Sequence, residues 1–96
     1  MKGGWVYIVT DQPNGTLYIG VTSDLARRIW EHREGVHDGF TKRYRLNRLV
    51  WSERFDDIRD AIACEKRMKE WKRAWKVKLI LASNPEWRDL YEDWNR

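Results

Sequence analysis

Two short apolar segments on either side of a turn sequence limit what this chain can fold into more than any other feature. Residues 5–10 (WVYIVT) and 17–22 (LYIGVT) are rich in β-branched and aromatic residues, which favour strands. An Asn-Gly pair between them is typical of a hairpin turn. Because Pro13 has no N–H group for a strand ladder, we expect a loop wider than two residues, with pairing that begins near Thr10 and Leu17.

Each segment carries one tyrosine, and strand alternation predicts where both tyrosines point. Side chains alternate between the two faces of a strand, and cross-strand partners share a face. If the aliphatic residues of both segments share one face, then Tyr7, Tyr18 and Gly20 lie together on the other. Several registers satisfy this match; in the wider-loop register Tyr7 lies across from Gly20 and diagonal to Tyr18. That register leaves a vacancy at the glycine, beside two phenols.

The rest of the chain predicts helices around one further strand. The expected elements are a helix from about 24 to 34 that Ser23 or Asp24 caps and Gly35 ends, a basic loop at 35–47, a strand at 48–55, a helix from Asp56 or Asp57 to about 69 or 71, a helix at 73–82, and a short final helix that Pro85 can open. On the third strand, Leu49, Trp51 and Phe55 are expected on one side. Arg28 and His32, four residues apart, form a neighbouring polar pair on the first helix.

Charge and composition narrow the class of protein. At 96 residues the chain predicts one domain, and its net charge is +4. Residues 86–96 sum to −2, so residues 1–85 carry +6, a basic body that favours a polyanionic partner such as nucleic acid. The only cysteine, Cys64, excludes an internal disulfide. With no secretory leader and no apolar run of membrane-spanning length, we expect a cytoplasmic protein without membrane association.

One carboxylate lies where an apolar residue is expected. The second predicted helix carries an apolar stripe of Ile58, Ala61, Ile62, Met68 and Trp71. Glu65 is three or four residues from several of these, so it lies on or beside the stripe. A carboxylate there is unfavourable unless it is paired or binds a metal. Two explanations stay open: an ion pair with Lys69, four residues on, or a metal ligand.

The order and spacing of these features are more specific than any one of them. The sequence runs "VYI", a loop, "YIG", then "DLARRIWEH" and a helical glutamate. This order resembles the GIY-YIG nuclease superfamily, with "WVY" as a degenerate first triplet and "YIG" intact. The whole chain, through "NPEW" and "EDW", is similar to the small stand-alone bacterial members. The resemblance implies an α+β fold of β-β-α-β-α-α order, with a three-stranded antiparallel sheet flanked by helices, in a single domain over residues 1–96.

The resemblance also implies an activity, that of a metal-dependent endonuclease that hydrolyses phosphodiester bonds in DNA. It assigns Tyr7 as the base that activates water and Tyr18 as the residue that orients Tyr7 or the water, and the two roles can be exchanged. Arg28 matches the family arginine and would clamp a phosphate, and Glu65 matches the glutamate that holds Mg²⁺ or Mn²⁺. His32 is a further catalytic candidate. Related modules belong to excision-repair and homing endonucleases, so DNA repair is the expected setting.

The residue types suit this reaction. A hard divalent ion prefers oxygen ligands and often keeps several waters, so Glu65, phosphate and water can complete its shell. Arg28 can donate two hydrogen bonds to phosphate oxygens. An unperturbed tyrosine has a pKa of about 10, so a tyrosine base needs nearby cations that favour the phenolate. Arg28, a bound metal and His32 are the candidates for that role.

Further side chains are candidates for contact with nucleic acid. They are the basic residues Arg27, Lys42, Arg43, Arg45 and Arg48, with Tyr44 as a base-stacking residue. We expect DNA as the partner, with branched and single-stranded forms among the candidates, and no small-molecule cofactor. An ordinary solvated connection explains the basic loop equally well. Two other functions stay open: a catalytically weak nucleic-acid-binding module on the same scaffold, and a protein-interaction domain that uses exposed tryptophans.

Overall fold

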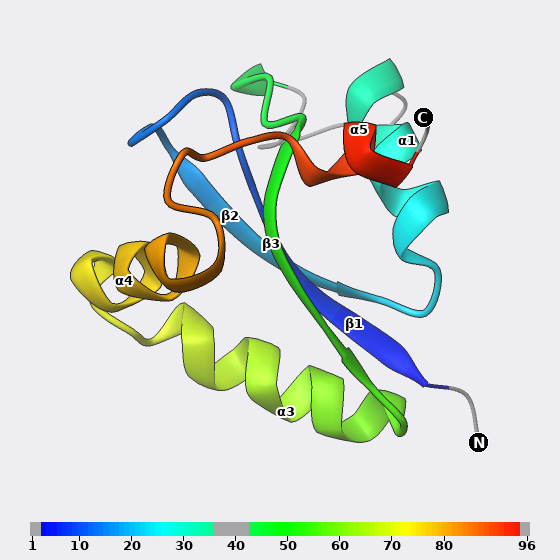
Figure 1. The fold of residues 1–96 in the computed structure, drawn as a ribbon. Coiled ribbons are helices and arrows are strands. Elements are labelled where there is room, and N and C mark those ends of the chain that lie inside the picture. The colour runs from blue at the N-terminus through cyan, green and yellow to red at the C-terminus, as the bar shows by residue number, and fades with distance from the viewer. Residues whose placement is uncertain (1–2, 36–42, 95–96) are drawn as a thin grey trace.

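The sheet has three strands, with the first strand of the chain at its centre. The computed structural model describes residues 3–35 and 43–94. Its elements in chain order are β1 (Gly4–Thr10), β2 (Leu17–Thr22), α1 (Leu25–Glu34), β3 (Arg48–Phe55), α3 (Ile58–Lys69), α4 (Arg73–Ser83) and α5 (Leu90–Trp94). The strands pair antiparallel in the order β2-β1-β3 (Figure 1). The α+β fold class and the antiparallel three-stranded sheet are therefore confirmed.

The β1–β2 hairpin has the predicted register. Pairing begins at Thr10 and Leu17, so residues 11–16 form the wide loop that Pro13 led us to expect. Tyr7 lies directly opposite Gly20. A shift of one residue would have sent one tyrosine to the aliphatic face. The arrangement of the tyrosines on the sheet was thus readable from the sequence.

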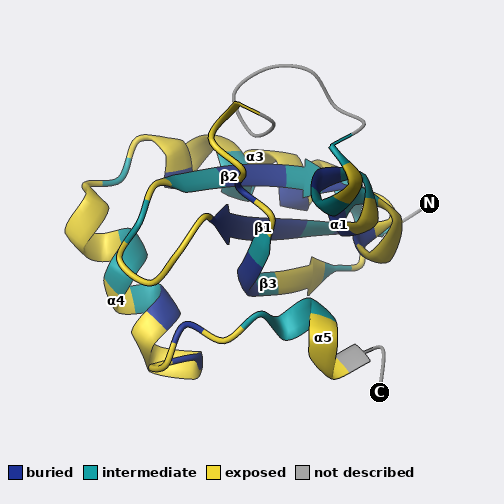
Figure 2. Ribbon diagram, turned by 90° about the horizontal axis from the view of Figure 1, so that it is seen from above, coloured by how far each residue is buried: buried dark blue, intermediate teal, exposed yellow. Residues whose placement is uncertain are grey.

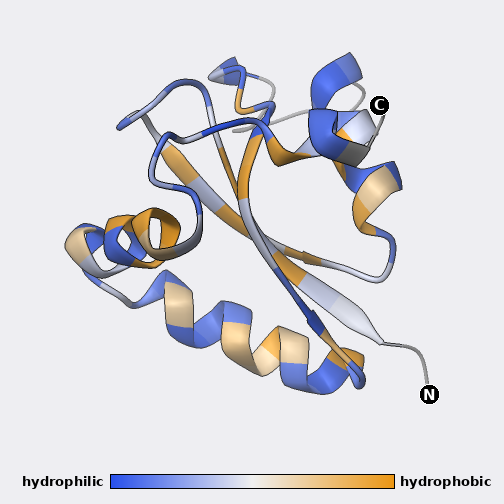
Figure 3. Cartoon of the chain, viewed as in Figure 1, coloured by the Kyte–Doolittle hydropathy of each residue, from blue (hydrophilic) through white to orange (hydrophobic). Residues whose placement is uncertain are grey.

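The sheet separates two hydrophobic clusters, one on each face. The first joins the sheet to α3 and α4; its buried members are Val6, Ile8, Ile19, Val50, Trp51, Ala61, Met68, Ile80 and Trp87. The second joins the sheet to α1; its buried members are Tyr7, Val9, Leu25, Ile29, Leu46 and Leu49. Figure 1 shows α3 and α4 on one side of the sheet and α1 and α5 on the other. Because β1 is covered on both faces, it is mostly dark blue in Figure 2, and Figure 3 shows apolar residues gathered along the strands.

A β-bulge in β3 separates Leu49 from the rest of its predicted face. The pairing of β1 with β3 shifts by one residue at Val50, which has no partner of its own in β1. An extra residue in one strand reverses the alternation beyond it. Leu49 therefore packs in the cluster beneath α1, while Trp51 and Phe55 pack in the cluster beneath α3. The prediction that these three residues share one side was wrong for Leu49.

Side-chain caps fix where the first helices begin. The Asp24 carboxylate accepts a hydrogen bond from the Arg27 N–H at 3.2 Å, so Asp24 rather than Ser23 caps α1. Gly35 ends α1 with a left-handed φ of 66°, as predicted. Asp57 caps α3 in the same way as Asp24 caps α1. Among the helices that the structure describes, none has the length and apolarity needed to cross a membrane.

The final helix begins at Leu90 and not at Pro85. Between them, Trp87 is buried and has a left-handed φ of 57°, a conformation that a right-handed helix does not contain. The Asn84 side chain holds this turn, because its oxygen accepts a hydrogen bond from the Arg88 N–H at 3.0 Å. The prediction that Pro85 opens the helix was wrong because burial of the tryptophan shapes this segment.

Candidate active site

Close contact with the backbone of Gly20 positions the Tyr7 ring. Tyr7 is only 1% exposed, and Gly20 is its partner in β2. A Cβ atom on Gly20 would overlap the hydroxyl and the ring of Tyr7. Glycine is therefore needed here to let another side chain approach the backbone. The predicted vacancy exists, and Tyr7 itself fills it.

His32 on α1 lies beside both tyrosines. Its Nε2 atom is 3.1 Å from the Tyr7 hydroxyl oxygen. The ring centroids of Tyr7 and Tyr18 lie 5.7 Å and 6.1 Å from that of His32, each in an edge-to-face arrangement. His32 continues the buried stripe of α1 after Leu25 and Ile29, so packing of the helix carries it to the sheet. We call Tyr7, Tyr18 and His32 the tyrosine cluster.

Arg28 of α1 acts on Tyr7 of this cluster, and Glu31 pairs with both Arg28 and its neighbour Arg27. Arg28 Nε is 3.2 Å from Glu31 Oε1, and Arg27 Nε is 3.6 Å from Glu31 Oε2. Together with residues 22–24 they line a hollow of about 240 Å³. Sequence reasoning missed Glu31, although its spacing of three and four residues from the arginines predicts such pairs. A phosphate that binds Arg28 must therefore compete with Glu31.

Burial dominates the ionisation of Tyr7. Its pKa rises from 10.0 to about 12, chiefly because the phenol is desolvated and secondly because Tyr18 is close. The positive charge of Arg28 lowers this pKa and the negative charge of Glu65 raises it. Arg28 thus acts in the direction expected from the sequence, but burial outweighs it. At neutral pH Tyr7 keeps its proton.

Glu65 pairs with Lys69 beside Tyr18. Lys69 Nζ is 3.1 Å from Glu65 Oε2 and 5.9 Å from the centroid of the Tyr18 ring. The Glu65 side chain is only 13% exposed, and its charge reaches Tyr7. The ion pair considered from the sequence is therefore present, and it lies next to the tyrosine cluster. Sequence reasoning missed the contact of Lys69 with Tyr18, because it joins α3 to a strand far away in the chain.

The donor set at Glu65 fits a divalent ion that keeps most of its waters. Among residues 3–35 and 43–94, no three His, Cys, Asp or Glu side chains gather at one point. Mg²⁺ commonly binds through one or two carboxylates plus substrate phosphates, without a full protein cage. To hold such an ion, the Glu65 carboxylate would give up its ion pair with Lys69 and bind the metal instead.

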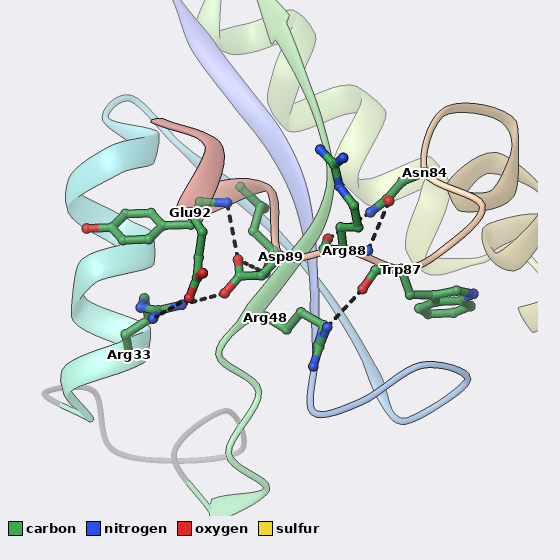
Figure 4. A network of polar contacts seen from close by, with 9 residues as sticks. Arg33, Arg48, Asn84, Trp87, Arg88, Asp89 and Glu92 are labelled. Atoms are coloured by element: carbon green, nitrogen blue, oxygen red, sulfur yellow. Dashed lines mark hydrogen bonds and ion pairs between the residues drawn. The ribbon is translucent and has the colours of Figure 1, made fainter. Parts of the chain in front are cut away.

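The predicted nucleic-acid contacts do not stay together in the structure. Arg43, Tyr44 and Arg45 are exposed before β3, and the Arg43 guanidinium lies 5.6 Å from the centroid of the Tyr44 ring. Arg48 is half-buried and donates to a main-chain carbonyl after α4 at 3.1 Å (Figure 4). Its first role is thus to fasten the C-terminal segment. Lys42 lies outside the described residues.

Asp89 forms a second polar centre, which sequence reasoning missed. Its carboxylate is 2.5 Å from Arg33 Nη1 and accepts hydrogen bonds from the N–H groups of Leu49 and Tyr91 at 3.2 Å and 3.1 Å (Figure 4). Arg33 also pairs with Glu92 at 3.5 Å. This Asp89 network joins α1, β3 and α5. No local pattern signals it, because Arg33 and Asp89 are 56 residues apart.

Comparison with known proteins finds one domain family and a group of small bacterial relatives. The family model for the GIY-YIG catalytic domain matches residues 3–78. A UPF0213 protein of Staphylococcus saprophyticus is 37% identical over 80 residues, covering 83% of this chain and 96% of that protein. A UPF0213 protein of Syntrophus aciditrophicus is 34% identical over 87 residues, covering 90% and 98%. The solution NMR structure of a UPF0213 protein from Bacillus halodurans is similar, with a TM-score of 0.55 and 26% identity, covering 92% of this chain and 93% of that one.

Proposed function

This chain belongs to the GIY-YIG family, and on that premise we propose that it is a metal-dependent endonuclease that hydrolyses phosphodiester bonds in DNA. The family is a nuclease superfamily whose members generally use a divalent metal and act on nucleic acid. One observation carries the proposal: packing of α1 and α3 around the hairpin brings His32 against both tyrosines and brings the charges of Arg28 and Glu65 close enough to act on Tyr7. A DNA-repair setting, a cytoplasmic location and a single domain over residues 1–96 remain predictions.

Burial distinguishes the roles of the two tyrosines. Tyr7 is almost fully buried and its pKa is about 12, which makes it a poor proton acceptor for water at neutral pH. Tyr18 is half-buried on the edge strand β2, with the Lys69 ammonium group over its ring. We therefore assign Tyr18 as the base that faces water. Tyr7 then orients Tyr18 through His32. The two tyrosines thus exchange the roles that the family resemblance first assigned to them, an alternative that the sequence left open.

The proposed hydrolysis divides its work among a few side chains. Arg28 donates hydrogen bonds to phosphate oxygens once Glu31 releases its guanidinium. Tyr18 accepts a proton from the attacking water, while the Tyr7–His32 hydrogen bond holds the neighbouring rings in place. A divalent ion held by Glu65 would neutralise charge on the phosphate and on the leaving oxygen.

Cleavage assays with matched tyrosine variants test this proposal. The protein is incubated with single-stranded, duplex and branched DNA, and with RNA, in Mg²⁺, Mn²⁺ or EDTA. Tyr18→Phe should cleave about 10²–10⁴-fold more slowly, the range for losing a general base. Tyr91→Phe on α5 removes a hydroxyl far along the chain and serves as the control. Undiminished cleavage by folded Tyr18→Phe would exclude the assigned base.

A nucleic-acid-binding module without useful catalysis is the second candidate. The observation that favours it is that the charges of the site already neutralise one another, Glu65 with Lys69 and Arg28 with Glu31. Tight binding of the substrate panel, with no cleavage in either metal, would select this function over the first.

A further inference from the structure

The end of α3 and the start of α4 carry a concentration of positive charge that the proposed site does not use. Residues 66–78 hold seven basic residues and one acidic residue, Glu70, a net charge of +6. The whole chain nets +4, so all other residues together sum to −2. The basic residues are Lys66, Arg67, Lys69, Lys72, Arg73, Lys76 and Lys78. Of these, only Lys69 contributes to the site described above.

An exposed tryptophan stands in the middle of this basic stretch. Trp75 is 56% exposed, more than any other large apolar side chain of the described chain. Trp71 packs edge to face against it, with ring centroids 6.3 Å apart, and so fixes how the Trp75 ring stands. Lys72, the N-cap residue of α4, and Lys78 lie three positions before and after Trp75 and are both exposed, a spacing that places side chains next to one another on a helix surface. We call Trp75, Lys72 and Lys78 the α4 platform; α4 lies on the outside of the fold (Figures 1 and 2).

Two basic side chains connect this platform with the tyrosine cluster. Lys69 lies over the Tyr18 ring. Arg73, at the start of α4, donates to the carbonyl oxygens of Asn14 and Gly15 in the hairpin loop at 2.9 Å and 2.7 Å. That loop leads directly into β2, where Tyr18 is the second residue. Positive charge therefore continues from the candidate active site to the platform.

We propose that the α4 platform binds an unpaired strand of nucleic acid, with a base stacked on Trp75 and phosphates against Lys72 and Lys78. Stacking on aromatic side chains within a basic surface is how proteins hold single strands without reading their sequence. Bases inside a duplex are already stacked and cannot reach a tryptophan that stands on a convex helix. The platform needs none of the site residues, so this binding goes beyond cleavage and persists without it.

Binding measured in EDTA separates the platform from the catalytic proposal, because no metal-dependent cleavage occurs there. Fluorescence anisotropy compares a labelled oligothymidylate with a duplex of the same length. Trp75→Ala should weaken binding of the single strand by about tenfold, the scale for losing one stacked base, and change duplex binding little. Trp75→Phe should keep most of the affinity, because it retains a stacking face. Trp30→Ala on α1 removes another half-exposed tryptophan, 50% exposed, and should leave binding unchanged.

The two lysines should appear in the salt dependence. Replacing both with glutamine should flatten the slope of log K against log salt by about 0.7 for each lost single-strand phosphate contact, whereas Trp75→Ala should keep the wild-type slope. Equal affinities of wild type and Trp75→Ala would overturn the proposal. Equal losses on strand and duplex would also overturn it, since they indicate a surface that senses charge alone. If Trp75→Ala fails a thermal-unfolding check, Trp75→Phe and the lysine variants decide by the same criteria.

Discussion

The tyrosine cluster and the Asp89 network are both polar centres beside α1, yet the charged side chains at the two centres find their partners in different ways. Asp89 takes partners from α1, β3 and α5, up to 56 residues away in the chain. Around the tyrosines, the charged pairs join side chains three or four positions apart on one helix, Glu65 with Lys69 and Arg28 with Glu31. One centre ties elements together, and the other pairs neighbours within an element.

This difference decides which charges can change partners. A pair on one helix contributes a few tenths of a kcal/mol, so a metal ion or a phosphate can replace either member at small cost. A carboxylate with three partners on three elements cannot lose one without moving an element or leaving a polar group unsatisfied. We therefore expect substitutions in the charged pairs around the tyrosines to change chemistry and those at the Asp89 network to change stability.

The largest expected effect is on cleavage, from Glu65→Gln. The variant keeps the shape of the side chain but loses the charged ligand, so cleavage should fall at least ~10²-fold, a typical scale for one positioned catalytic contribution. It should still fold, and should be at least as stable without metal. Single-turnover cleavage and thermal melting with and without Mg²⁺ measure both. Glu70→Gln, at the end of α3, is the matched control, and full activity of folded Glu65→Gln would refute the metal-ligand role.

The next effect is on stability at high pH, through Tyr7. The pKa of Tyr7 is about 12 in the folded protein, above an unfolded value of 10.0, so folding favours the protonated phenol. The resulting stability is fully present below pH 10 and is lost as the pH rises from 10 to 12. Two pKa units correspond to about 2–3 kcal/mol. Urea unfolding at each pH should show that the free energy of unfolding of the wild type falls by this much more than that of Tyr7→Phe. Parallel plots of the free energy of unfolding against pH for the two proteins would contradict the burial of the phenol.

A similar but slightly smaller change is expected for Asp89→Ala. It removes the acceptor of two main-chain N–H groups and the shorter of the ion pairs of Arg33, which should reduce the free energy of unfolding by about 2 kcal/mol and the Tm by roughly 10 °C. Cleavage per folded molecule should change by less than about twofold. Asp93→Ala removes an exposed ion pair with Arg88 and should change stability by less than ~0.5 kcal/mol. If Asp89→Ala lowered cleavage but not stability, the contrast between the two centres would be reversed.

The smallest expected effect is that of Lys69→Gln. The change should alter stability by only a few tenths of a kcal/mol, because Lys69 is half-exposed and the glutamine amide can still donate a hydrogen bond to the Glu65 carboxylate. The affinity of Glu65 for Mn²⁺ should rise about twofold, which corresponds to the same few tenths of a kcal/mol. The reason is that the ion no longer has to displace an ammonium group. A Mn²⁺ titration followed by water-proton relaxation measures this. Weaker Mn²⁺ binding in the variant would show that Lys69 supports the ion and does not compete with it.

Local rules were sufficient where a structure is decided by neighbours in the chain. The alternation of side chains and the missing N–H of Pro13 predicted the hairpin register, and with it the face that Tyr7 and Tyr18 share. Capping chemistry predicted that α1 ends at Gly35 and narrowed its N-cap to Ser23 or Asp24, of which the structure has Asp24. These features depend on a few adjacent residues, so a single sequence contains them.

The same rules failed where distant segments meet. Val50 is an ordinary strand residue, and only its pairing with β1 makes it a bulge that turns Leu49 to the other face. Because Trp87 is buried, the last helix begins at Leu90 and not at Pro85. The partners of Asp89 could not be predicted from the sequence, because the chain contains many carboxylates and arginines and no local pattern indicates which of them pair.

Chain connectivity also sets the order in which the candidate site can assemble. β1 and β2 meet across residues 11–16, and hairpins of this kind form within roughly 1–10 μs. β3 pairs with β1 only after the chain has passed through α1, and such long closures are slower. Both tyrosines therefore lie on a hairpin that local contacts can form, whereas His32 and Glu65 reach them only when α1 and α3 pack on the sheet. We therefore expect a partly folded chain, in which these helices have not yet packed, to be inactive in the cleavage assay.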